Sequence, residues 1–185
     1  WLSDWTQIGS LLYERFARHY VATSADTTDA EAEAARDHFL ETIYPNVQKA
    51  NQQLIARLLE SEQVPAGMEI PIKKMRTDAE LFREENLPLQ TQEMKLSSQY
   101  NKIIGAQTVT WNGAEKTPTQ LQKEMLTPDR AERQAIWEAI TARQLADRAG
   151  LNELWGQFMG LRGQIAANAG LDNYLEYAWL ARKRY

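Results

Sequence analysis

The chain has 185 residues, which is enough for one large domain or two small ones around a hydrophobic core. Acidic residues outnumber basic ones by 25 to 21, and the resulting net charge of −4 argues against nucleic acid as the main partner, because phosphate binding needs a basic surface. The absence of cysteine excludes disulfides and thiolate metal sites, and favours a reducing, cytoplasmic location.

The sequence also predicts no membrane partner and no secretion. No run approaches the roughly 20 consecutive apolar residues that a membrane-spanning helix needs. The opening residues, Trp1 to Trp5, lack both the basic and the apolar region of a signal peptide. Because the chain does not begin with Met and both ends fall inside predicted helices, we expect it to be cut from a longer protein.

Apolar residues at steps of three and four predict helices along the first third of the chain. The second helix runs from about residue 29 to 61, is capped by Asp26 or Thr28, and keeps its phase across Pro45, which predicts a kink or a tight restart there. Residues 61–76 contain Pro65, Gly67 and Pro71 and predict a connection, with a short extended piece at 69–72. The first helix ends near residue 22 and has one apolar face, made of Leu2, Trp5, Ile8, Leu12, Phe16 and Tyr20.

A third helix is predicted from about residue 78 to 104, with Thr77 as its N-cap and a break at Pro88 that would divide it into two helices. The period then changes at residues 106–116, where apolar and threonine residues alternate before Asn112-Gly113, the strongest two-residue hairpin signal. The predicted fold class is therefore mainly α, a multi-helix array with one small β-hairpin at about residues 106–116. We expect two regions: a helical pair with its connection at 1–76, and the helices with the hairpin at 77–185.

The last third of the chain carries the clearest helix boundaries. Thr117-Pro118 opens a capping box and a short helix, and Thr127-Pro128 repeats the signal for a helix that Gly150 is predicted to end. Gly170 is predicted to stop the next helix, and Asn173 to cap the last one. The apolar positions of these helices are Ile136, Trp137, Ile140, Leu145, Leu151, Leu154, Trp155, Phe158, Leu161, Ile165 and Ala169.

No group of residues in the sequence matches a known catalytic motif. His19 and His38 lie on different predicted helices, and neither has a second histidine at helical metal-binding spacing. Glu41 lies three residues after His38, so a shared ion stands beside two other interpretations, a solvated ion pair and a partly buried histidine. The acidic run that begins at Asp26 lacks the glycine and glutamate of a calcium loop, and Glu84-Glu85 point about 100° apart on a helix. We therefore predict no catalytic and no metal-binding residue here, and leave the substrate-binding residues unassigned.

Two further features allow alternatives. Gly156, Gly160 and Gly163 form a smooth strip, which favours close packing against another helix; a cleft that admits a peptide backbone is the other interpretation. Arg162, at the border of the apolar stripe, is expected to anchor a buried carboxylate or carbonyl rather than a substrate.

Four pieces of the chain, in order, resemble the thimet oligopeptidase/oligoendopeptidase F family of zinc metallopeptidases. Three are similar to its oligoendopeptidase F branch, and the fourth is the pattern Arg162-x-x-x-Ala166-x-x-x-Gly170-x-x-Asn173-Tyr174-x-Glu176-Tyr177. Leu171 departs from the Phe or Tyr usual there but fills the same apolar slot. The other three pieces are Leu81-Phe-Arg-Glu-Glu-Asn-Leu-Pro-Leu89, Ala106-Gln-Thr-Val-Thr-Trp-Asn-Gly113 and Asp129-Arg-Ala-Glu-Arg133 followed by Trp137.

The resemblance implies an amino-terminal, helical channel wall of an enzyme that hydrolyses peptide bonds in oligopeptides. It also implies that residues 77–185 continue into a catalytic half, where the two histidines of a His-Glu-x-x-His helix and a later glutamate hold one zinc ion. None of those ligands occurs in this sequence, so we expect the chain alone to be inactive and to bind no zinc. The alternative is a stand-alone, non-catalytic helical module that binds a protein partner.

Overall fold

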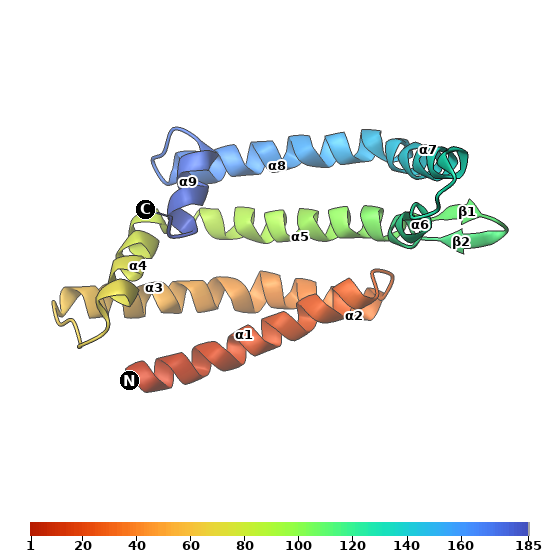
Figure 1. Ribbon diagram of the computed structural model, residues 1–185. Coiled ribbons are helices and arrows are strands. Elements are labelled where there is room, and N and C mark those ends of the chain that lie inside the picture. Colours follow the sequence, from red (N-terminus) through yellow and green to blue (C-terminus); the bar gives the residue numbers. More distant parts are fainter. Residues whose placement is uncertain (185) are drawn as a thin grey trace. The chain divides into compact units, whose positions relative to one another are not determined.

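The computed structural model describes residues 1–184 and shows a mainly helical chain with one small hairpin (Figure 1). This confirms the predicted fold class. The chain divides into two compact units, residues 1–96 with 158–184 and residues 97–157. Within residues 1–184, none of the helices combines the length and the apolar character that a bilayer crossing needs.

The first unit begins with two antiparallel runs of helix (Figure 1). Helix α1 (Leu2–Ala25) ends in a short turn. The second run then consists of α2 (Ala30–His38), a π-helical turn (Phe39–Ile43) and α3 (Tyr44–Glu60), which follow one another without interruption. Pro45 lies in the first turn of α3, directly after the π-helical turn, so the break in the backbone ladder falls where the phase is reset. The predicted tight restart is confirmed. The predicted cap is wrong: Asp29 caps α2, while Asp26 Oδ1 closes the preceding turn by accepting from Thr28.

The segment after α3 contains a helix that the sequence pattern, with its two prolines, does not predict. Helix α4 (Glu69–Leu81) covers the predicted extended piece, and Pro71 lies in its first turn, where a backbone N–H has no helical partner in any case. Thr77 is therefore no N-cap; it is buried within α4 and its Oγ1 donates to Lys73 O. Helix α5 (Asn86–Gly105) begins two residues before Pro88, which confirms the predicted division into two helices.

The second unit contains the hairpin and the helices around it. Strands β1 (Val109–Trp111) and β2 (Ala114–Lys116) pair antiparallel, and Asn112 and Gly113 both adopt positive φ, as a two-residue turn of this kind requires. Helix α6 (Pro118–Glu124) carries the predicted capping box of Thr117 and Gln120. Helix α7 (Arg130–Ala146) is capped by Asp129 rather than by Thr127.

Helix α8 (Arg148–Asn168) begins one residue after the C-cap of α7, so Gly150 lies inside it and is not the predicted stop. Gly170 is a stop, with φ +77°, and the amides of Gly170 and Leu171 donate to the carbonyls of Ala167 and Ala166. This is the Schellman arrangement. Asn173 then caps α9 (Tyr174–Ala181), as predicted, by accepting from Glu176 N.

The buried positions follow only part of each predicted apolar stripe. Ile136, Ile140, Leu154, Phe158 and Ile165 are buried as expected. Several aromatic and aliphatic members are instead exposed. These exposed members are Ile8, Tyr20, Trp137, Leu145 and Trp155. Trp137 and Trp155 each follow a buried residue and point about 100° around the helix from it, away from the contact face.

Candidate functional site

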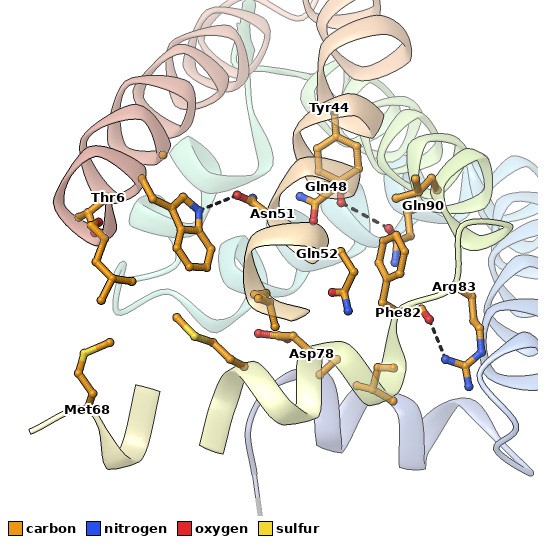
Figure 2. A pocket seen from close by; sticks show the side chains of 18 of the residues that line it. Thr6, Tyr44, Gln48, Asn51, Gln52, Met68, Asp78, Phe82, Arg83 and Gln90 are labelled. Carbon is orange, nitrogen blue, oxygen red and sulfur yellow. Dashed lines mark hydrogen bonds between the residues drawn. The ribbon is translucent and has the colours of Figure 1, made fainter. Parts of the chain in front are cut away.

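A cavity of about 680 Å³ lies in the first unit, between α1, α3, α4 and the start of α5 (Figure 2). Its volume is within the range of pockets that hold small ligands. Most of its wall is apolar or aromatic. These residues include Leu2, Trp5, Tyr44, Ile55, Met68, Met75, Leu81, Phe82, Leu87 and Tyr177.

Three carboxamides on α3 face this cavity, and we call it the carboxamide pocket after them. Gln48, Asn51 and Gln52 lie at positions i, i+3 and i+4, which places them on one face of the helix. Asn51 Oδ1 accepts from Trp5 Nε1 at 2.9 Å, which ties α1 to α3. Gln48 and Gln52 make no hydrogen bond to any residue that the structure describes, and Figure 2 shows Gln52 directed into the space between α3 and α4. Two partly buried amides are thus available to a ligand.

Both charged side chains of the pocket wall already have partners within the protein. Asp78 is ion-paired with Lys183, which follows α9. The Arg83 guanidinium donates to the carbonyl oxygens of Phe82 (2.7 Å), Glu80 (3.0 Å) and Ala169 (3.4 Å). The pocket therefore presents two unpartnered carboxamides and a cationic Arg83 held by carbonyl groups, on a largely apolar wall.

A chain of hydrogen bonds closes one side of the pocket. Tyr44 Oη donates to Gln90 Oε1 at 3.4 Å, and Gln90 Nε2 donates to Tyr177 Oη at 3.2 Å. Burial raises the pKa of Tyr44 and of Tyr177 above the usual tyrosine range, and the nearby Glu93 carboxylate adds to both shifts. The two phenols are therefore neutral hydrogen-bonding groups at neutral pH.

Arg162 on α8 extends this polar cluster, and its predicted role is confirmed. Its Nε donates to Glu93 Oε1 at 2.6 Å, and its guanidinium lies over the Phe158 ring at 4.7 Å and the Tyr174 ring at 5.3 Å. The bond joins α5 to α8 across 69 residues of sequence. Arg162 is thus a structural anchor for a carboxylate.

Among the residues that the structure describes, no other helix packs on the glycine strip of α8. A Cβ built on Gly156, Gly160 or Gly163 would meet nothing within 4 Å. Trp155 and Met159, next to Gly156 and Gly160 in the sequence, have side chains that are 59% and 54% exposed. The strip is an open surface.

The histidines form no metal site with their neighbours. His19 packs against the Phe39 ring, with centroids 5.6 Å apart, and burial together with the charge of Arg15 lowers its pKa. Glu41 forms a salt bridge with Lys95, with 2.5 Å between Oε1 and Nζ, so its ion-pair partner is Lys95 and not His38. Within residues 1–184, no three histidine, aspartate or glutamate side chains come together as a metal site would need.

Sequence patterns had not indicated the carboxamide pocket. A signal was present: Gln48, Asn51 and Gln52 border the apolar stripe of α3 at helical spacing, although solvent-facing residues show the same pattern. Only the seating of α1 and α4 against α3 turns that face inward.

No protein-family model matches the sequence, and no curated protein matches it. Solved structures match the fold. A protein from Bacillus anthracis str. Ames, assigned as an oligoendopeptidase F, has a TM-score of 0.78 and 26% sequence identity, over 90% of this chain and 31% of its own. A second protein assigned as an oligoendopeptidase F has a TM-score of 0.77 and 25% identity, over 94% of this chain and 33% of its own.

PZ peptidase A with an inhibitor has a TM-score of 0.80 at 22% identity, over 94% of this chain and 32% of its own, which shows the fold alone. This chain therefore spans about a third of the length of the three solved proteins. The helical array, with its hairpin, is similar to one part of these peptidases.

Proposed function

We propose that the chain is the amino-terminal, channel-wall part of a zinc-dependent oligoendopeptidase, which hydrolyses peptide bonds in short peptides. The observation that carries the proposal is the structural match to an oligoendopeptidase F over 90% of this chain, with a TM-score of 0.78 and 26% identity. Four ordered sequence motifs between Leu81 and Tyr177, found independently of the fold, resemble the same family.

The surface of α8 supports a role as a wall within a larger protein. Trp155 and Met159 are more than half exposed beside the open glycine strip of that helix. Exposed large apolar side chains of this kind are typical of surfaces that another part of a protein covers or that a ligand contacts. In the proposed enzyme, this face of α8 adjoins the catalytic half and the peptide that it holds.

The residues of this chain do not fit the zinc ion of the proposed enzyme. The two histidines lie on different helices, and residues 1–184 contain no group of three metal-ligating side chains. The His-Glu-x-x-His motif would have to lie in the catalytic half. The part of this chain in the activity would be to shape the channel, not to supply a catalytic group.

The test compares this chain with its longer gene product on an internally quenched oligopeptide, with and without a chelator. We expect cleavage by the longer product only, loss of that cleavage with chelator, and its recovery on addition of zinc. A longer product whose motif glutamate is replaced by glutamine is the inactive control. Chelator-sensitive cleavage by this chain alone, or no cleavage by the longer product, would overturn the proposal.

A further inference from the structure

We propose that the carboxamide pocket binds an uncharged peptide segment, with one apolar or aromatic side chain buried in it; the assignment of that peptide as a substrate rests on the proposed function. The pocket has about 680 Å³ of space, two unpartnered carboxamides and a largely apolar wall. These three properties together select the class of ligand.

The charges of the wall favour an uncharged ligand. Asp78 is occupied by Lys183, and Arg83 by three backbone carbonyls. An amine would have to compete with Lys183 for Asp78, and a phosphate or carboxylate would have to share the Arg83 guanidinium with the three carbonyls it already bonds. Binding either one would leave a poorly paired charge in a partly buried site, which is costly.

The polar groups of the wall match amides. Gln48 and Gln52 each offer two N–H donors and one carbonyl acceptor, one turn apart on α3, and both are partly buried. A peptide unit offers one donor and one acceptor, so a single carboxamide can satisfy both. The amide atoms of both side chains remain accessible to water, so a peptide that replaces this water adds one net hydrogen bond of modest strength.

The rest of the wall selects a side chain. Trp5 of α1 and Phe82, the C-cap residue of α4, line the cavity, and Met68 and Met75 add flexible thioethers to its wall. Figure 2 shows Phe82 and Met68 on different sides of the space below α3. Aromatic and methionine side chains can adapt to an apolar side chain of variable shape. A polyhydroxylated ligand, such as a sugar, would not bury the apolar wall that these side chains form.

Isothermal titration calorimetry with this chain tests the proposal, using the tripeptide Gly-Phe-Gly with an acetylated amino end and an amidated carboxyl end. We expect saturable binding at millimolar peptide or below. Gln48→Met and Gln52→Met keep the length and the helix propensity of the side chain and remove the amide. Each should weaken binding about threefold to tenfold, the change that one net hydrogen bond produces.

The matched control is Gln53→Met on the same helix, which is exposed and outside the pocket and should bind as the parent chain does. A neutral apolar dye, N-phenyl-1-naphthylamine, reports whether the pocket persists in the two variants. It should bind them as tightly as the parent chain or more tightly. Peptides with lysine or aspartate in place of the phenylalanine should bind more weakly.

Three results would overturn the proposal: no binding of the blocked tripeptide, equal binding by the parent chain and both pocket variants, or equal loss in Gln53→Met. Because the titration uses this chain and no cleavage, its outcome is independent of the peptidase test. Peptide binding without peptidase activity in the longer product would overturn only the proposed function. Cleavage without binding here would overturn only the pocket assignment.

Discussion

The two compact units differ in how far apart in the sequence their buried contacts lie. In residues 97–157, an apolar cluster of Leu121, Ile136 and Ile140 is packed against the hairpin, with Val109 and Trp111 partly buried on it. In residues 1–96 with 158–184, buried polar side chains join helices that lie far apart in sequence. Asn86 is 1% exposed and bonds to Ile165 O (3.0 Å) and Asn168 (2.8 Å), 79 and 82 residues away.

This difference indicates which interactions determine how the elements of each unit come together. The cluster of residues 97–157 is formed by neighbouring elements, so short-range patterns and a non-directional hydrophobic effect suffice to assemble it. The other unit must bring α5 next to α8 in one register, and directional hydrogen bonds between buried groups discriminate against other registers. Four substitutions, in decreasing order of expected effect on the free energy of unfolding, separate the two cases.

The largest effect is expected in the apolar cluster. Leu121→Ala removes a side chain that is fully buried and leaves a cavity between α6 and α7, which should cost about 3 kcal/mol of unfolding free energy. Urea unfolding followed by circular dichroism measures it. Leu126→Ala, at a position that is 87% exposed, is the matched control and should change little. Equal losses in the two variants would contradict the assigned core.

A smaller loss is expected at a buried polar side chain of the first unit. Asn86→Leu keeps the shape of the side chain but leaves Ile165 O and the Asn168 amide without their partner, at a cost of about 2 kcal/mol. The same urea unfolding applies, with Asn152→Leu on the exposed side of α8 as the control. A stability equal to that of the parent chain would show that these bonds do not hold α5 against α8.

The capping box of α6 is local and should matter less. Thr117→Ala removes the side chain that accepts from Gln120 N, and such a loss costs about 1 kcal/mol. Thr119→Ala, two residues on and exposed, makes no such bond and should be close to neutral. The difference between their unfolding midpoints in urea is the measurement, and no difference would exclude the cap as a source of stability.

The smallest change at neutral pH, and the most specific one, concerns Tyr44. Burial raises the pKa of its phenol above 10.0, so the folded state favours the neutral form. That stabilisation is complete below the pKa of the unfolded chain and is lost as the pH rises through the higher folded value. Urea midpoints between pH 8 and 11 should therefore fall less steeply for Tyr44→Phe than for the parent chain. Tyr13→Phe, which removes a phenol at an exposed position, is the matched control.

Sequence patterns located those features whose partners lie within a few residues. Asn112-Gly113, the Thr117 box, Gly170 and Asn173 were each predicted, because turns and caps are made by adjacent backbone groups. The incorrect predictions also came from applying short-range rules. The prolines predict a connection at Pro71, although the first turn of a helix tolerates proline. The apolar spacing predicts that Trp155 is buried, although it lies about 100° around the helix from Leu154.

The sequence by itself determined a mainly helical chain with one hairpin, and a resemblance to oligoendopeptidases that the solved structures support. Tertiary structure decided the rest: that Arg162 meets Glu93, that the glycine strip of α8 is open, and that Gln48 and Gln52 face a pocket. The physical reason is how far apart in the sequence the interacting residues lie. Helical period and cap chemistry act over a few residues, whereas the partner of a buried polar group is chosen by packing between segments tens of residues apart.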